Sequence, residues 1–211
     1  MERMEPFAAA TDPPVRGTLH RATGDDVLVL AHGAGSNHDA PLLRALAHAF
    51  VERGVSVLRC DLPYRQAHPK GPPSPAGAER DRRGLARALE TIGGARGRRF
   101  IGGHSYGGRQ ASMLLAESPA VAHALLLLSY PLHPPGKPDR LRTQHLPGLR
   151  VPTLFVHGAR DPFGTLAEIE AARALIPSPS AVLPLPRAAH VLHADSATSR
   201  EVVEALFRLI G

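Results

Sequence analysis

Short apolar runs alternate along the chain with longer segments in which apolar residues recur at helical spacing. The runs predict seven strands, at residues 15–20, 27–31, 55–59, 100–102, 124–129, 153–157 and 181–185. Helical periodicity predicts five helices, at residues 41–53, 79–92, 105–118, 166–175 and 196–210. Several of the runs are apolar without alternation, as strands covered on both faces are. The pattern therefore predicts an α/β fold with a mostly parallel central sheet and helices on both faces.

Two long segments, residues 61–77 and 130–150, are rich in proline and show no clear period. Loops of that length in a compact domain are usually functional or disordered. Each segment follows a predicted strand, and ligands of open α/β sheets bind beyond the carboxyl ends of the strands. We expect both segments to wall a pocket.

A serine motif joins a predicted strand to a predicted helix. The string R-F-I-G-G-H-S-Y-G-G-R contains G-x-S-x-G, formed by Gly103, Ser105 and Gly107. A serine hydroxyl is a poor nucleophile until a base removes its proton, and flanking glycines permit the tight turn that presents its oxygen. The motif is short, but a strand before it and a helix after it are the context that the chemistry needs. We therefore predict Ser105 as the nucleophile.

Acyl transfer also needs donors for the developing oxyanion. The run V-L-V-L-A-H-G-A-G ends a predicted strand in a glycine-rich turn that can aim a backbone N–H at the site. Our candidate donors are the amides of Ala34 and Tyr106. The alternative is that Gly33 and Gly35 serve only a tight strand-to-helix turn.

The acid and the base follow later strands. Asp161 comes after the strand 153–157 in H-G-A-R-D and can orient a histidine, although an aspartate before Pro162 is also typical of a turn or a helix cap. His190 follows the strand 181–185 and is our candidate base, with His193 as the alternative. The chain order Ser105, Asp161, His190 is that of one particular hydrolase fold.

With these residues the chain resembles the α/β-hydrolases over nearly its whole length. The strings G-G-H-S-Y-G-G-R-Q-A-S, S-Y-P-L-H-P-P-G-K-P-D-R-L-R-T-Q-H-L and H-G-A-R-D-P-F-G resemble a small dienelactone-hydrolase-like branch, similar to testis-expressed and chromatin-complex (NSL) hydrolase-fold proteins. The resemblance implies that Ser105, Asp161 and His190 are the catalytic set. True dienelactone hydrolases carry a cysteine at the nucleophile position, whereas Cys60 follows a different strand here, which argues against a dienelactone substrate.

The length of 211 residues predicts a single domain, 1–211, and no insertion is long enough for a separate lid domain. The net charge of +6 and a pI near 10.4 are compatible with nucleic-acid binding, but the arginine groups are short and only 4% of residues are aromatic. We interpret them as solvated surface charge and expect no nucleic-acid partner.

Several other classes are excluded by residue usage. With Cys60 as the single cysteine, no internal disulfide and no multi-thiolate metal site is possible, and the 12 histidines form no H-E-x-x-H motif, so we expect no metal and no cofactor. The longest strongly apolar stretch, residues 120–129, is too short to cross a bilayer, and the N-terminal M-E-R-M-E-P lacks the pattern of a signal peptide. We expect a cytoplasmic protein without membrane contact.

Three cations are candidate substrate-binding residues. Arg109 lies one helical turn beyond Ser105, and Lys137 and Arg142 lie in the segment 130–150. Together they can recognise an acidic group on a substrate. The alternative is that Arg109 is paired structurally and that the other two are solvated.

The pattern as a whole favours a serine-dependent acyl hydrolase of the carboxylesterase type, acting on small or accessible esters. The alternative is a non-catalytic binding or scaffold protein on the same fold. Dinucleotide binding is disfavoured because His38 occupies the third glycine position of G-x-G-x-x-G. The oligomeric state cannot be derived from these patterns.

Overall fold

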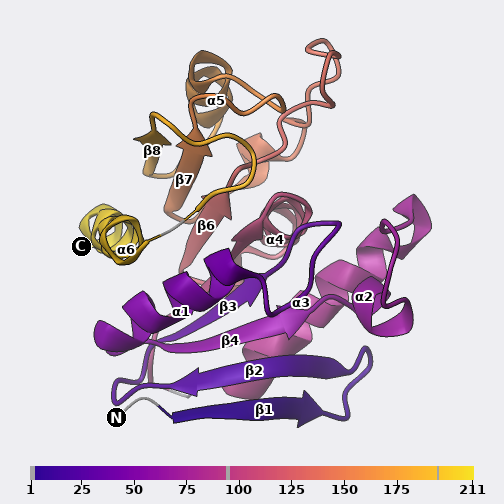
Figure 1. Ribbon diagram of the computed structural model, residues 1–211, viewed down its shortest axis with the longest axis vertical. Helices are drawn as coiled ribbons and strands as arrows, with labels where there is room; N and C mark the ends of the chain where they lie inside the picture. Colours follow the sequence, from indigo (N-terminus) through magenta and orange to yellow (C-terminus); the bar gives the residue numbers. More distant parts are fainter. Residues whose placement is uncertain (1–2, 94–95, 194) are drawn as a thin grey trace.

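The computed structural model describes residues 3–93, 96–193 and 195–211, and its centre is one eight-stranded sheet (Figure 1). The strand order across the sheet is β1-β2-β4-β3-β5-β6-β7-β8. The strands are β1 (Arg3–Ala9), β2 (Val15–Arg21), β3 (Val27–Ala31), β4 (Ser56–Asp61), β5 (Arg99–His104), β6 (Ala124–Leu128), β7 (Thr153–Gly158) and β8 (Ser180–Leu185). The six strands from β4 to β8 in this order run parallel, and only β1 and β2 are antiparallel to their neighbours. The predicted α/β fold with a mostly parallel sheet is confirmed.

Helices cover both faces of the sheet. They are α1 (Pro41–Glu52), α2 (Pro63–Ala67), α3 (Ala78–Ile92), α4 (Tyr106–Glu117), α5 (Leu166–Arg173) and α6 (Ser196–Ile210). The apolar sides of α1 and α6 pack on one face, where Phe50 and Leu206 are fully buried. Those of α3, α4 and α5 pack on the other, around Leu85, Leu115 and Ile169. Since each sheet face has its own buried layer, the strands are apolar on both sides, as their unalternating sequences predict.

The strand order reverses between β3 and β5. From β3 the chain crosses to β4 on one side and then returns to β5 on the other. The carboxyl ends of β3 and β5 therefore point to the same edge from adjacent strands, which is where open α/β sheets bind ligands. The turn 32–35 follows β3 and Ser105 follows β5.

Strand β1 was not among the predicted strands. It lies at one edge of the sheet, its side chains are exposed or half-buried, and it contains Pro6. Proline cannot donate to a strand ladder, so it lowers the strand signal, yet an edge strand tolerates it. Strand β8, at the opposite edge, also contains a proline, Pro184.

The proline-rich segments are only partly irregular. The first contains α2 and a short 3₁₀ turn, Pro75–Gly77, so the prediction of a loop over residues 61–77 was only partly correct. The second contains one such turn, Leu146–Gly148. In the parts of the chain that the structure describes, no helix combines the length and the apolar character that crossing a membrane requires. Met1 and Glu2, which begin the N-terminal string discussed above, lie outside these parts.

Candidate active site

Ser105 occupies the sharp turn between β5 and α4. Its backbone has φ 50° and ψ −113°, a conformation that L-residues rarely adopt. The turn can be this tight because the two flanking glycines have no Cβ and can therefore approach the backbone at the end of β3. A Cβ on Gly103 would lie 2.6 Å from the oxygen of Ala31, and one on Gly107 would lie 2.5 Å from the oxygen of His32. The G-x-S-x-G spacing thus lifts the Ser105 hydroxyl clear of the turn.

The His190 imidazole lies between Ser105 and Asp161. Its Nε2 is 2.9 Å from the Ser105 Oγ, and its Nδ1 is 2.8 and 3.1 Å from the two Asp161 oxygens. Because a carboxylate only accepts, Nδ1 carries the proton, and Nε2 is free to accept the serine proton. The alternative base, His193, is exposed on the cavity rim and makes no such bridge.

The Asp161 carboxylate is fixed at the carboxyl end of β7. Its side chain is fully buried, and its Oδ1 also accepts from the Phe163 amide at 2.8 Å. The Phe163 ring lies against the His190 imidazole, with 4.1 Å between centroids. The imidazole is therefore held by the carboxylate at one edge and by an aromatic ring on one face.

His104, for which sequence reasoning gave no role, also contacts this group. Its Nε2 donates to the His190 carbonyl at 2.9 Å. Burial lowers the pKa of His104, so the ring is neutral and acts as a hydrogen-bond donor only through Nε2. It occupies an unspecified position of G-x-S-x-G, so the motif carries no signal for it.

The two candidate oxyanion donors lie beside Ser105. Tyr106 is the first residue of α4, so its N–H has no acceptor within the helix. Ala34 follows Gly33, where an added Cβ would be 3.6 Å from the Ser105 Cβ. No hydrogen bond engages the Ala34 N–H among the residues that the structure describes. Ala34 and Tyr106 both line the cavity together with Ser105.

Comparison with known proteins identifies the family and the fold. The family model described as an alpha/beta hydrolase domain matches residues 24–208. The chain belongs to this α/β-hydrolase family. Its fold is also that of solved hydrolases: a dienelactone hydrolase from Anabaena variabilis (TM-score 0.76, 21% identity, 98% of this chain and 96% of that one covered), Est1E from Butyrivibrio proteoclasticus (0.75, 15%, 97% and 98%) and the esterase domain of a Rhodothermus marinus protein (0.68, 16%, 100% and 100%).

In this α/β-hydrolase a cavity of about 800 Å³ opens over Ser105. Its walls are largely apolar and include prolines from both proline-rich segments, as expected from their positions after strands. Apart from the triad and the turn 32–35, the residues that line it include Leu42, Leu43, Pro72, Pro73, Pro75, Pro131, Phe163, Val191 and Leu192.

One wall of the cavity carries polar groups. Arg109, Gln110 and Arg142 line it, whereas Lys137 is exposed and lies outside the lining. Neither arginine forms an ion pair with a carboxylate in the described parts of the chain. The buried Nε of Arg109 and Nε2 of Gln110 have no hydrogen-bond partner there. The wall therefore offers positive charge to the cavity, while these two unsatisfied donors are buried behind its surface.

The charge of this wall affects its neighbours. Burial and the charge of Arg109 lower the pKa of Arg142. Burial, with Arg109 and Arg82, lowers the pKa of His145 to about 4. A ligand carboxylate between the guanidinium groups would reduce this like-charge repulsion.

The remaining chemical groups lie apart from the site. Cys60 is buried in β4, and burial raises the pKa of its thiol to about 12, so it is not a nucleophile. No cluster of three or more metal-ligating side chains occurs in residues 3–93, 96–193 and 195–211.

Proposed function

We propose that this α/β-hydrolase is a serine-dependent acyl hydrolase of the carboxylesterase type. The observation that carries the proposal is the continuous hydrogen-bond chain from Ser105 through His190 to Asp161. The family assignment and the cavity above Ser105 support it. This chain supplies what nucleophilic catalysis by serine needs, namely a hydroxyl, a base within hydrogen-bond reach and a carboxylate that orients the base.

The reaction proceeds in two halves. In the first, His190 Nε2 takes the Ser105 proton as Oγ attacks the ester carbonyl, and the oxyanion accepts from the amides of Ala34 and Tyr106. The tetrahedral intermediate expels the alcohol, which receives that proton from His190. In the second half, His190 deprotonates water, the hydroxide attacks the acyl-serine, and the acid leaves as Ser105 regains its proton. Asp161 stabilises the imidazolium in both halves.

The cavity limits which esters can react. Its apolar walls suit small or accessible acyl groups, and the elements in the described parts of the chain include no separate lid domain that would cover it. Arg109 and Arg142 add a preference for substrates that carry a carboxylate besides the scissile ester, because a guanidinium binds a carboxylate with two parallel hydrogen bonds. Lys137 does not belong to this group, because it is exposed and does not line the cavity.

A fluorophosphonate probe tests the proposal without knowledge of the substrate, because it reacts only with an activated serine. We expect the wild type to be labelled at Ser105 and to hydrolyse short p-nitrophenyl esters. Protein that is folded by circular dichroism but neither reacts with the probe nor cleaves any ester would instead support a binding or scaffold role.

A further inference from the structure

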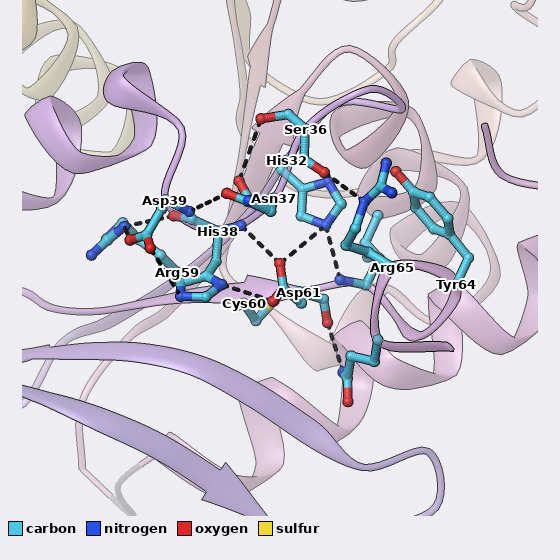
Figure 2. Close-up of polar contacts among 12 residues, drawn as sticks. His32, Ser36, Asn37, His38, Asp39, Arg59, Cys60, Asp61, Tyr64 and Arg65 are labelled. Carbon is cyan, nitrogen blue, oxygen red and sulfur yellow. Dashed lines mark hydrogen bonds and ion pairs between the residues drawn. The ribbon is translucent and has the colours of Figure 1, made fainter. Parts of the chain in front are cut away.

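A group of polar side chains forms hydrogen bonds with the loop that follows β3 (Figure 2). These side chains come from the end of β4 and from α2, and none of them belongs to the triad. They contact the loop through its backbone carbonyls and through His38, whose amide and Nδ1 both lie 2.8 Å from oxygens of Asp61. The loop contains Ala34, the candidate oxyanion donor.

The direction of the Gly33 carbonyl is fixed by the His32 side chain and by the Ser36 amide, which donates to its oxygen at 3.1 Å. His32 Nε2 accepts from the Leu62 amide at 3.1 Å, so its proton is on Nδ1, which donates to the Gly33 oxygen at 2.8 Å. Burial lowers the pKa of His32 and keeps the ring neutral. The Tyr64 hydroxyl oxygen also lies 3.2 Å from this oxygen, but its single proton is directed at the closer Ala34 oxygen. The Gly33 carbonyl therefore points into the protein, away from the cavity.

The orientation of this carbonyl decides that of the Ala34 N–H. Both belong to one planar trans peptide group, in which C=O and N–H point in opposite directions. Since the carbonyl points toward His32 and Tyr64, the N–H is turned to the side of the cavity that Gly33 and Ala34 line with Ser105. If the peptide rotated, the cavity would face an oxygen, which repels an oxyanion.

Arg65 and Tyr64 fix the next peptide group. The Ala34 oxygen accepts from the Tyr64 hydroxyl at 2.8 Å and from Arg65 Nη2 at 2.9 Å, and Arg65 Nε donates to the Ser36 oxygen at 2.8 Å. Burial raises the pKa of Tyr64 to about 12, so the hydroxyl keeps its proton. Rotation of either peptide would break these bonds.

Arg65 is an unusual residue for a purely structural role. It is 8% exposed, and in the described part of the chain its guanidinium faces four backbone carbonyls and no carboxylate. Burying a charge is costly unless other interactions compensate, and here the compensation comes from these carbonyls and from the Tyr64 ring, whose centroid is 5.1 Å from the guanidinium carbon. Two of these carbonyls, those of His68 and Gly71, precede the prolines of the cavity wall. The Arg65 side chain thus connects the loop that contains Ala34 to that wall.

We propose that Tyr64 and Arg65 are positioning residues that keep the Ala34 N–H directed at the oxyanion. The inference rests on the proposed function, since it assigns these side chains to the same reaction. Asp81 extends the arrangement to the second donor: it accepts from the Tyr64 amide at 2.9 Å and from the Tyr106 hydroxyl at 2.7 Å. Asp81 thus links Tyr64, which holds the Ala34 carbonyl, to Tyr106, which carries the second donor.

The test compares Tyr64→Phe, Arg65→Lys and Arg65→Ala with the wild type on a short p-nitrophenyl ester. Loss of one oxyanion donor lowers kcat by roughly 100- to 1,000-fold, so a misdirected donor should lower it by about 10- to 100-fold with little change in KM. Arg65→Lys should recover part of the loss. The matched control is Arg98→Ala, because Arg98 also makes several hydrogen bonds, to Asp26, but at the opposite end of the sheet. It should retain kcat per active site.

A second readout separates positioning from general destabilisation. The Ser105 Oγ adds to the carbonyl of a trifluoromethyl ketone and forms a hemiketal oxyanion. The corresponding alcohol cannot react and only fills the cavity. The variants should bind the ketone more weakly by the factor lost in kcat and bind the alcohol as the wild type does. Equal weakening for both compounds, or unchanged kcat in folded Tyr64→Phe, would overturn the proposal. A wild type that neither hydrolyses esters nor reacts with fluorophosphonate contradicts the proposed function instead, so the two failures are distinguishable.

Discussion

His104 Nε2 lies 2.9 Å from the carbonyl oxygen of His190, so the residue that precedes the nucleophile supports the backbone of the base. We expect His104→Ala to lower kcat by about fivefold, the effect of one neutral hydrogen bond, because the His190 loop loses its support. His104→Gln places an amide N–H near the same point and should retain most of the activity. The measurement is kcat per active site titrated with fluorophosphonate; equal losses in both variants would contradict a role for this bond.

Ser105 combines a hydroxyl 2.9 Å from His190 Nε2 with a strained backbone of φ 50°. We expect Ser105→Ala to abolish probe labelling and to lower ester hydrolysis by roughly 1,000-fold or more, since only the nucleophilic oxygen is removed. Ser105→Gly should be equally inactive but more stable than Ser105→Ala by about 1 kcal/mol, because glycine adopts φ 50° without a Cβ clash. Urea denaturation measures the difference. Equal stability of the two variants would show that the turn is not strained.

The two histidines after β8 should differ sharply. His190→Ala removes the bridge between Ser105 and Asp161, so it should lose activity almost as fully as Ser105→Ala does. His193→Ala should keep the activity, because His193 is exposed at the rim and outside the bridge. Kinetics of both variants on one ester decide the assignment, which would be reversed if His193→Ala were the inactive protein.

The cationic wall predicts a preference for acidic esters. Relative to a neutral ester of the same shape, an ester with an added carboxylate should gain about tenfold in kcat/KM, and salt should reduce the gain. Arg109→Ala and Arg142→Ala should each reduce the ratio, whereas Lys137→Ala should not, because Lys137 is outside the lining. Equal rates for the two esters on the wild type would show that these arginines have another role.

Acid should destabilise the fold partly through His145. Its pKa is lowered from 6.5 to about 4 by burial and by Arg109 and Arg82, so between these values the unfolded chain binds a proton that the folded chain does not. Stability is therefore full above pH 6.5 and falls as the pH drops toward 4. In thermal unfolding at several pH values, His145→Gln should lose less stability over this range than the wild type. The exposed His68→Gln is the control and should follow the wild type.

The sequence carries a clear signal for the triad because each of its members follows a strand. Ser105 comes with glycines that only a tight turn needs, and Asp161 and His190 follow apolar runs that end at the same sheet edge. Parallel strands bring such positions together whatever the loops do. That is why local patterns were sufficient to select residues that the fold places within hydrogen-bond distance.

The supporting residues could not be found in this way. Tyr64 and Arg65 lie in a proline-rich stretch whose short helix has too few residues for a period, and their partners are carbonyls, which every residue possesses. Lys137 was predicted to bind substrate because it is a cation in the segment 130–150. Whether a charge faces a cavity depends on how a loop folds back, and composition does not encode that.

Each outer edge of the sheet carries a proline, Pro6 in β1 and Pro184 in β8. An edge strand with free N–H and C=O groups is a template on which a strand of another molecule can align. At each edge the missing N–H of proline interrupts that row of donors. The sheet therefore resists being extended from one molecule to the next, which protects a protein whose sheet interior is mostly apolar from aggregation through its strand edges.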